Sequence, residues 1–292
     1  MICPIQMLEL RQSADLSFSA YSVEFDECYH SLREGALKES LQKHIQPAFA
    51  KILQNLRAQG ALQNISQNAL QSGALAGGIF ENSAFGALKA PVCEAQAHIA
   101  ILDICFGLGY NSFATLLYYA TYAPKIRLWI YSPEKDCQLL DSLSSFPYPS
   151  EFSALSLSEI LYALTNYGIY EGKNANIELY KGDALEYVKT LRNESFDIIY
   201  QDAFSPRKNP ALWSEEYFMQ CFRILKPNGI LTTYSQSAQI RQNGINCGFF
   251  AYDFKPKICE GANKIRGGTL LLKEPLLELE NYVLKSIAKR EI

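Results

Sequence analysis

From His98 to residue 273, short apolar runs alternate with segments of helical spacing, and this alternation constrains the fold most strongly. The apolar runs are HIAILDI, IRLWIYS, IELYKG, FDIIYQD and ILTTYS, and the helical patterns cover 111–123, 133–143, 183–192 and 214–225. Such alternation is typical of a parallel sheet covered on both faces. Two final runs, GFFAYDF and GGTLLLK, predict an antiparallel edge hairpin. We therefore expect a doubly wound α/β fold with seven strands and with ligands at the strand carboxyl ends.

Another helical pattern lies in the first 95 residues, which we treat as an element added to a sheet-forming domain over 96–275. Its apolar positions are Leu37, Leu41, Ile45, Phe49, Ile52 and Leu56. Pro47 is expected to break or kink this helix, because it lacks an N–H group. We expect a pair of helices packed on the main body, with a partner-binding helix as the alternative. We also expect a loop over 63–78 and a C-terminal helix over 276–292.

Composition and charge restrict the partners and the compartment. Hydrophobic residues make up 48% of the 292 residues, which excludes a disordered chain, and the net charge is −3. Binding to nucleic acid would therefore need a local basic patch. There is no signal-peptide pattern, and no apolar run approaches the ~20 residues of a membrane span. Eight cysteines without CxxC spacing and three scattered histidines argue against zinc, so we expect a cytoplasmic protein with reduced thiols and no metal.

A glycine-containing loop follows the first predicted sheet strand. Gly107 and Gly109 allow a tight turn and a close approach of the backbone to a ligand. The third glycine of a dinucleotide fingerprint would fall on Ser112, which disfavours NAD and FAD. Asp103, four residues before the first glycine, suits a ligand with a cationic amine, such as an amino-acid moiety. A purely structural turn is the alternative.

Carboxylates also follow the next two strands. Glu134 is placed to accept hydrogen bonds from ribose hydroxyls, although a helix N-terminus would favour the same residue. Asp183 could accept from an adenine amine or cap the following helix. The glycine loop contains no lysine that could bind phosphates. The three acidic residues at successive strand ends therefore favour S-adenosylmethionine over ATP or NAD.

The most specific segment is DAFSPRKNPALW, residues 202–213, which follows the strand FDIIYQ. Asp202 is therefore expected at a strand end that faces the crevice. Two prolines, an asparagine and aromatic residues indicate a rigid loop, and loops at this edge of a sheet commonly hold a second substrate. A structural turn would explain the prolines, but not a carboxylate between Gln201 and an aromatic residue.

These residues resemble the methyltransferase domain of the MnmC-like family, the tRNA 5-methylaminomethyl-2-thiouridine biosynthesis enzymes. The family's loop D-G-F-A-P-x-K-N-P-x-x-W corresponds to residues 202–213, with Ala203 for glycine and Ser205 for alanine. Its cofactor loop is E-x-G-F-G-T-G-x-N, from which Cys105 and Leu108 depart. The positions that match it are Asp103 (in charge), Phe106, Gly107, Gly109 and Asn111.

Shorter patterns extend this resemblance from about residue 20 to 273, with a poor fit near 50–90 and 145–170. The family's E-K falls on Glu134 and Lys135, and its G-D falls on Gly182 and Asp183. The N-terminal pattern F-D-[DE]-x-Y-x-S-x-x-x-G matches Phe25, Asp26, Glu27, Tyr29, Ser31 and Gly35. Bifunctional members carry a C-terminal FAD-dependent oxidoreductase domain, and the length of this chain predicts the stand-alone methyltransferase form.

The resemblance implies a Rossmann-like class I methyltransferase that transfers a methyl group from S-adenosylmethionine to the primary amine of 5-aminomethyl(-2-thio)uridine at the tRNA wobble position. It implies cofactor binding by Asp103, Phe106, Gly107, Gly109, Asn111, Glu134 and Asp183. Asp202 would bind the amine and take its proton, directly or through water. Phe204 would stack on or wall the uracil, and Pro206 would be a further substrate-binding residue.

The implied partner is tRNA, and no association with a membrane is expected. The chain is expected to be a monomer that cooperates with a separate enzyme, which makes the aminomethyl group. Contacts to phosphates are expected from Arg207, Lys208, Lys255, Lys257, Lys264 and Arg266. A solvated surface is the alternative for these charges. Two other functions stay open at this point: an aminopropyltransferase of the spermidine synthase type, and a non-catalytic protein that binds nucleosides or tRNA.

Overall fold

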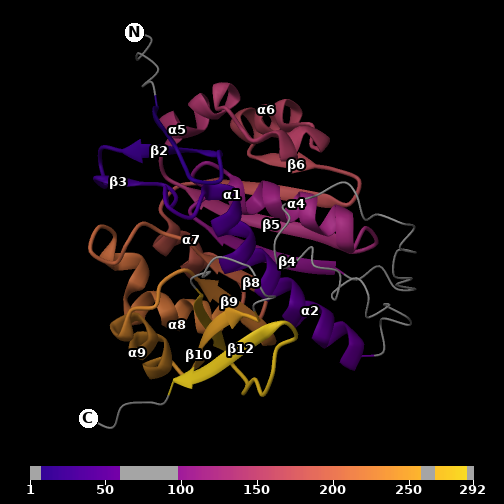
Figure 1. Cartoon of the computed structure of the whole chain (residues 1–292), viewed down its shortest axis with the longest axis vertical. Coiled ribbons are helices and arrows are strands. Elements are labelled where there is room, and N and C mark those ends of the chain that lie inside the picture. Colours follow the sequence, from indigo (N-terminus) through magenta and orange to yellow (C-terminus); the bar gives the residue numbers. More distant parts are fainter. Residues whose placement is uncertain (1–7, 60–97, 258–266, 288–292) are drawn as a thin grey trace.

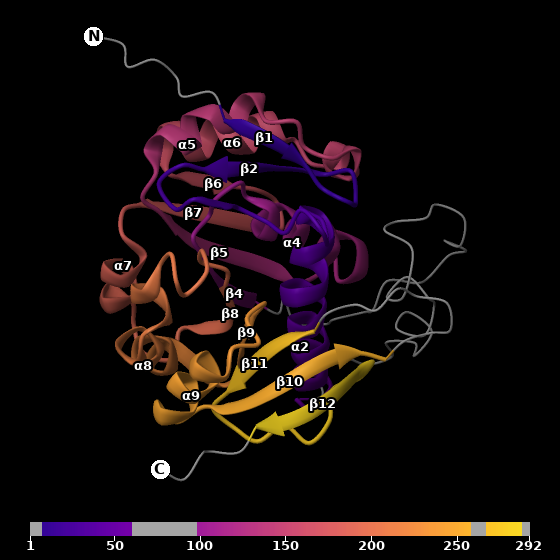
Figure 2. The same cartoon turned by 60° about the vertical axis from the view of Figure 1, so that its left-hand side comes forward.

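A computed structural model describes residues 8–59, 98–257 and 267–287 of the chain. Its centre is a sheet of nine strands in the order β12-β10-β11-β9-β8-β4-β5-β7-β6 (Figures 1 and 2). Five neighbouring strands run parallel: β4 (His98–Ile104), β5 (Arg127–Glu134), β7 (Ala175–Lys181), β8 (Phe196–Gln201) and β9 (Leu225–Thr233). The predicted α/β sheet is confirmed, and its parallel strands end at one edge, where ligands bind in such folds.

Antiparallel strands extend the sheet on both sides. The predicted hairpin is present as β10 (Phe250–Pro256) and β11 (Gly268–Leu272), which pair in antiparallel register. Two further strands, β6 (Ile169–Glu171) and β12 (Tyr282–Ile287), raise the number from the expected seven to nine.

The helix predicted over 276–292 is wrong, because residues 282–287 form the edge strand β12, which pairs with β10. Tyr282 and Leu284 are two positions apart and lie on the same face of the sheet, where both contact the core. A strand buries this pair through its period of two, whereas a helix would separate them. Residues 288–292 lie outside the described residues.

Helices cover both faces of the sheet, as the alternating pattern predicts. The helices after the N-terminal region are α4 (Tyr110–Tyr122), α5 (Cys137–Ser142), α6 (Leu157–Tyr167), α7 (Ala184–Thr190), α8 (Glu215–Ile224) and α9 (Ala238–Asn246). Side chains alternate along β4, so Ile99 and Ile101 enter one core cluster while Leu102 and Ile104 enter the other. In the described part of the chain, no helix is long and apolar enough to cross a membrane.

The N-terminal element combines a small sheet with a long helix. Its strands are β1 (Glu9–Gln12), β2 (Phe18–Ser22) and β3 (Glu27–Cys28), which pair antiparallel in that order and which the sequence analysis did not predict. The small sheet lies near α5 and α6, at the end of the molecule opposite β10 and β12 (Figure 2).

The helix of this element consists of α1 (Ala36–Glu39), a π-helical turn (Ser40–Ile45) and α2 (Gln46–Ala58), without a break between them. Pro47 lies in the first turn of α2, directly after the π turn. The predicted interruption is therefore a local widening of the helix rather than its end, because a π turn changes the backbone hydrogen bonding that proline would otherwise disrupt. The expected second helix and the loop over 63–78 lie outside the described residues.

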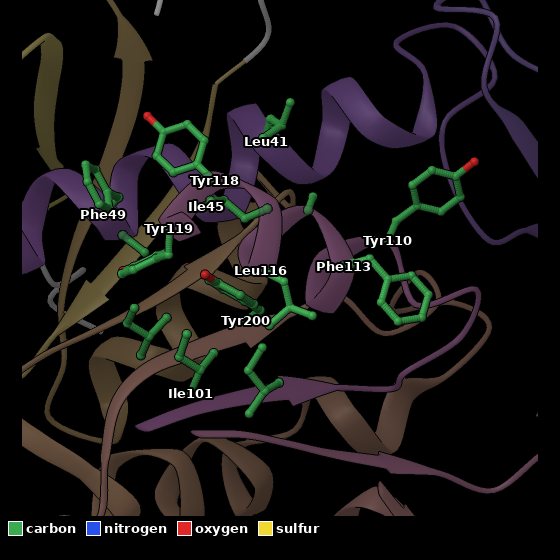
Figure 3. Close-up of a cluster of buried hydrophobic side chains, with 14 of the residues drawn as sticks. Leu41, Ile45, Phe49, Ile101, Tyr110, Phe113, Leu116, Tyr118, Tyr119 and Tyr200 are labelled. Atoms are coloured by element: carbon green, nitrogen blue, oxygen red, sulfur yellow. The ribbon is translucent and has the colours of Figure 1, made fainter. Parts of the chain in front are cut away.

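The six apolar positions predicted for this helix are all buried. Leu41, Ile45 and Phe49 face α4 across a cluster of aromatic side chains (Figure 3). The Phe49 ring meets Tyr118 and Tyr119 edge-on, with centroid distances of 5.1 and 5.0 Å. Edge-to-face contacts of this kind are favourable beyond the burial of apolar area. The N-terminal helix is thus part of the main core, which fixes where its polar side chains lie.

Candidate active site

The glycine loop after β4 is bent into the left-handed region of backbone space. Gly107 has φ 53° and Gly109, which precedes α4, has φ 77°. A Cβ atom on Gly109 would lie 2.5 Å from the Phe113 ring, so a side chain there would displace it. Cys105 also has a positive φ, 66°, at the position where the family pattern has glycine. The family's glycine is therefore explained by the backbone conformation that this cysteine adopts.

Glu134 connects this loop to the end of β5. Its carboxylate accepts hydrogen bonds from the N–H groups of Gly107 and Asp136, each at 2.9 Å. The side chain is largely buried, and this burial raises the pKa of Glu134. The carboxylate is therefore held rigidly at the strand end, on the wall of a cavity.

Asp183 combines the two roles that the sequence left open. Its Oδ1 atom accepts hydrogen bonds from the N–H groups of Leu185 (2.9 Å) and Glu186 (3.1 Å) and so caps α7. The residue also lines the cavity. Because one oxygen makes both capping bonds, the cap does not require Oδ2, which stays available to a ligand.

Asp103 lies behind the glycine loop and not on the cavity wall. Its side chain has no exposed surface, and it accepts hydrogen bonds from Ser112 Oγ (2.7 Å) and Asn111 Nδ2 (3.3 Å). Burial raises the pKa of Asp103 to about 7. The geometry thus gives this carboxylate a place beneath the loop, where it orients the first turn of α4.

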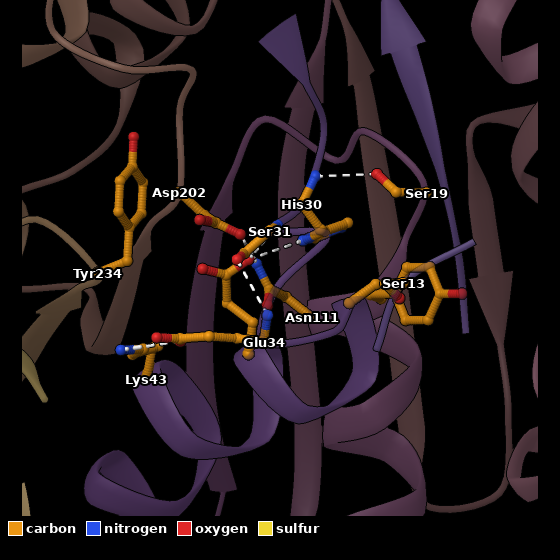
Figure 4. A network of polar contacts seen from close by, with 12 residues as sticks. Ser13, Ser19, His30, Ser31, Glu34, Lys43, Asn111, Asp202 and Tyr234 are labelled. Carbon is orange, nitrogen blue, oxygen red and sulfur yellow. Dashed lines mark hydrogen bonds and ion pairs between the residues drawn. The ribbon is translucent and has the colours of Figure 1, made fainter. Parts of the chain in front are cut away.

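Asp202 follows β8 and lies on the cavity wall, as expected for a strand end at this edge. Asn111 Nδ2 donates to its Oδ2 atom at 2.9 Å, and His44 Nε2 lies 3.4 Å from Oδ1. Figure 4 shows Asp202 beside Asn111 and His30. Burial alone would raise the pKa of Asp202, but His44, His30 and the Asn111 hydrogen bond outweigh it and hold this pKa below its ordinary value.

The two histidines near Asp202 come from the N-terminal element, and the sequence analysis did not select them. His44 lies in the π turn and His30 in the segment after β3, and both are buried. His44 Nδ1 lies 3.0 Å from Thr232 Oγ1 of β9. Scattered histidines have no spacing that predicts a site. The only sequence signal for them is that His30 occupies the unspecified position of the family pattern between Tyr29 and Ser31.

The N-terminal pattern covers the loop after β8. The Phe25 ring stacks on Phe204 with a centroid distance of 4.4 Å, and Tyr29 lies 5.0 Å from the same ring. Glu27 accepts a hydrogen bond from Ser205 N–H at 3.1 Å. Two sequence motifs almost 180 residues apart therefore form one structure at the strand ends.

Basic residues of this loop point to its outer side. Lys208 Nζ pairs with Asp26 at 2.7 Å, which lowers the pKa of Asp26, and Arg207 is exposed. Neither residue lines the cavity at the strand ends, and Pro206 does not line it either. Lys255 and Lys257 are exposed at the end of β10, whereas Lys264 and Arg266 lie outside the described residues.

The cavity at the strand ends brings together seven of the predicted site residues: Phe106, Gly107, Asn111, Glu134, Asp183, Asp202 and Phe204. Asp103 and Gly109 shape it from behind without lining it. Tyr29, His30 and Asn209 add polar groups that the sequence analysis did not list as site residues. Within the described residues, no group of three or more His, Cys, Asp or Glu side chains is placed to hold a metal ion.

Comparisons with known proteins identify the class of protein to which this chain is similar. Residues 153–259 match the family described as S-adenosyl-L-methionine-dependent methyltransferase. An uncharacterized protein of Methanocaldococcus jannaschii is 28% identical over 60% of this chain and 46% of its own length. The tRNA 5-methylaminomethyl-2-thiouridine biosynthesis bifunctional protein MnmC of Pseudomonas entomophila is 29% identical over 56% of this chain and 26% of its own length.

A solved structure covers more of the chain. The crystal structure of MNMC2 from Aquifex aeolicus has a TM-score of 0.66 and 27% identity, and the match covers 92% of this chain and 70% of that one. The chain spans less than half the length of the two curated relatives described above. The fold and the site define an S-adenosylmethionine-dependent methyltransferase. Within that class, the chain is similar to the MnmC proteins and to MNMC2.

The residues at the strand ends fit S-adenosylmethionine, the cofactor of this class. Asn111 Oδ1 is buried and has no hydrogen-bond partner among the described residues, although Asn111 lines the cavity. A buried acceptor of this kind needs a donor, and the ammonium group of the cofactor's amino-acid moiety is one. A Cβ atom on Gly107 would lie 3.2 Å from Tyr29 Cδ1. Such an atom would narrow the cavity beside the backbone of the glycine loop.

Proposed function

We propose that this enzyme methylates the primary amine of 5-aminomethyl(-2-thio)uridine at the wobble position of tRNA. The observation that carries the proposal is Asp202, a buried carboxylate that is kept charged and lies on the cavity wall beside Phe204. The acceptor amine is a cation in water, and a buried carboxylate is the group that binds such a cation. The printed name of the Pseudomonas entomophila relative, a tRNA 5-methylaminomethyl-2-thiouridine biosynthesis protein, supports the same substrate.

On this proposal, Phe106, Gly107 and Asn111 bind the cofactor from the glycine loop, with Gly109 and Asp103 supporting them. Glu134 accepts hydrogen bonds from ribose hydroxyls, and Asp183 accepts one from the adenine amine through its Oδ2 atom. When bound, the cofactor supplies a methyl group already activated on a sulfonium. The contribution of the protein is therefore mainly to position the amine against that methyl, and orientation contributes up to roughly 7–11 kcal/mol in ideal cases.

Asp202 has two tasks in this reaction. Its carboxylate pairs with the acceptor ammonium and takes a proton from the nitrogen, directly or through water, which frees the lone pair for attack. Asn111 donates to Oδ2 and His44 lies against Oδ1, so the carboxylate cannot rotate away from the amine without losing both contacts. The lowered pKa of Asp202 keeps it charged at neutral pH, which favours binding of the ammonium.

The acceptor base and the rest of the tRNA would meet different surfaces. Phe204 walls the uracil, because its ring lines the cavity and is stacked on Phe25. Arg207 and Lys208 on the same loop, with Lys255 and Lys257, are exposed or near the surface and would contact phosphates.

The proposal is tested by presenting two acceptors to the purified chain with S-adenosylmethionine labelled in the methyl group. One acceptor is tRNA from a strain that lacks this protein. The other is putrescine, which is tested in a separate reaction with a donor that carries the label in its aminopropyl portion. We expect label in the tRNA, and nucleoside mass spectrometry should locate it on the aminomethyluridine. Transfer to putrescine, or to no aminomethyl nucleoside, would refute the proposed substrate.

A further inference from the structure

A second cavity lies on the other side of Asp202. It shares Tyr29, His30, Asp202 and Phe204 with the cavity at the strand ends, so these four residues form a partition between the two. The second cavity contains none of the glycine loop or of the ends of β5 and β7. In methyl transfer, the attacking nitrogen and the departing sulfur lie on opposite sides of the methyl carbon. Two cavities that share one wall would let the donor and the acceptor approach from opposite sides.

The second cavity is acidic. Beyond the partition it is lined by the carboxylates of Glu27, Glu34 and Glu39 and by one cation, Lys43, which pairs with Glu34 at 3.1 Å. With Asp202 in the partition, four carboxylates and one ammonium of the described residues line this cavity. This excess of negative charge suits a cationic ligand.

Glu39 is the most buried of the three glutamates. It is 8% exposed, and its Oε2 atom accepts a hydrogen bond from Ser31 N–H at 2.8 Å. The hydrogen bond fixes the carboxylate where the segment after β3 crosses the cavity. Burial, and then the nearby Asp202, raise the pKa of Glu39 to about 7. A cation bound between these two carboxylates would relieve their repulsion.

His30 provides an observation independent of the acidic residues. Its side chain is 7% exposed and lines both cavities, yet its Nδ1 atom has no hydrogen-bond partner among the described residues. Glu39 Oε2 lies 3.9 Å away, which is too long for a hydrogen bond. A buried ring nitrogen without a partner is costly unless a ligand supplies one. Burial lowers the pKa of His30, which favours the neutral ring.

We infer that the second cavity receives the acceptor as a primary alkylammonium group on a pyrimidine, and that Glu39 and His30 bind its nitrogen from the side opposite the cofactor. The inference rests on the proposed function and adds to it the entry side and the residues that select an amine. An ammonium group has three N–H donors, and Asp202, Glu39 and His30 are acceptors that line the same cavity.

The transfer step is consistent with this placement. One proton leaves the ammonium nitrogen for Asp202, which frees a lone pair. The nitrogen then bonds to the methyl carbon while the carbon–sulfur bond breaks and its electron pair goes to sulfur. The product is a secondary ammonium. Glu39 still binds it after the methyl group has taken the position of the nitrogen lone pair.

The first test uses Glu39→Gln, which removes the charge but keeps an oxygen for Ser31 N–H. With aminomethylated tRNA as acceptor, we expect KM for tRNA to rise at least tenfold while the affinity for S-adenosylmethionine, from calorimetry, changes less than twofold. Glu159→Gln, an exposed carboxylate of α6 outside both cavities, is the matched control and should behave as wild type. A KM for Glu39→Gln within twofold of wild type would overturn the inference.

A second test covers the case in which Glu39→Gln does not fold, as judged by circular dichroism. Gln236 is exposed and lines the second cavity, so it tolerates either charge. A lysine there attracts phosphates but repels an ammonium, and a glutamate does the reverse. If the amine enters here, Gln236→Lys raises KM several-fold relative to Gln236→Glu. An equal or opposite order would overturn the inference.

Failure of the proposed function gives a different result. If the wild-type chain does not methylate aminomethyluridine in tRNA at all, the proposed substrate is wrong. If wild type methylates it and neither the Glu39 nor the Gln236 variants change KM in the stated directions, the function stands and the entry side is wrong.

Discussion

His44 Nε2 lies 3.4 Å from Asp202 Oδ1, on an imidazole ring that has no exposed surface. The other ring nitrogen lies 3.0 Å from Thr232 Oγ1, so the ring is held at both ends. His44 reaches this position from a π turn, which shifts side chains around the helix axis relative to a regular helix. A residue of the N-terminal element thereby orients and electrostatically supports the carboxylate at the end of β8.

We predict that His44→Gln moves the pH dependence of methyl transfer. His44 lowers the pKa of Asp202, so its removal raises that pKa. The carboxylate must be charged to bind the ammonium, and the acid limb of kcat/KM should therefore shift to higher pH. The measurement is a pH profile of both proteins on the same tRNA. An unchanged acid limb would show that His44 supports the core only.

Asp202→Asn tests the chemistry directly. Asparagine keeps the shape of the side chain but cannot take a proton or hold a charge. We expect kcat to fall by about 10²–10⁴, the range for loss of a general base, with little change in the affinity for S-adenosylmethionine. Single-turnover assays on undermodified tRNA separate the two effects. A rate near that of wild type would mean that the proton leaves to water and that Asp202 only positions the amine.

Glu134 is expected to act in cofactor binding and not in the chemical step. Glu134→Ala should weaken binding of S-adenosylmethionine by roughly 1–3 kcal/mol, because ribose hydroxyls and the N–H of Gly107 lose their acceptor. Glu134→Gln keeps an acceptor oxygen and should lose less. Calorimetry measures both, and an unchanged affinity of the alanine variant would remove Glu134 from the site.

Cys105 gives a prediction about stability. Its φ of 66° costs a residue with a side chain about 1–2 kcal/mol, whereas glycine carries a larger chain entropy of roughly 0.5–1 kcal/mol. Cys105→Gly should therefore raise the free energy of unfolding by up to about 1.5 kcal/mol. Cys105→Val, which is β-branched, should lower it. Urea unfolding measures both changes, and the reverse order of the two variants would contradict the backbone argument.

Sequence periodicity predicted the parallel core well because each strand there is buried on both faces and each helix on one. HIAILDI, for example, coincides with β4. The pattern failed for residues 276–292, because the edge strand β12 is held by backbone pairing with β10, which leaves a weak signal in the side chains. The strand β1 carries no side-chain pattern either, because it is exposed along its whole length.

Motif spacing located the strand ends and the carboxylates that follow them, since a parallel sheet brings successive strand ends to one edge. Glu134, Asp183 and Asp202 could therefore be predicted to meet. The sequence also predicted that Asp103 lies at a strand end. It could not predict whether this side chain faces the cavity or lies buried behind the glycine loop. Its burial depends on how Asn111 and Ser112 turn toward it at the start of α4.

The sequence by itself determined the fold class, the cofactor loop and the carboxylate that opens the loop after β8, because these follow from local pattern and from strand order. Only the tertiary structure decided that His30, Glu39 and His44 surround Asp202. They lie more than 150 positions away in the chain, on an element whose helix packs on α4 through apolar contacts. Those contacts, and not any spacing of the polar residues, bring the three side chains to the strand ends.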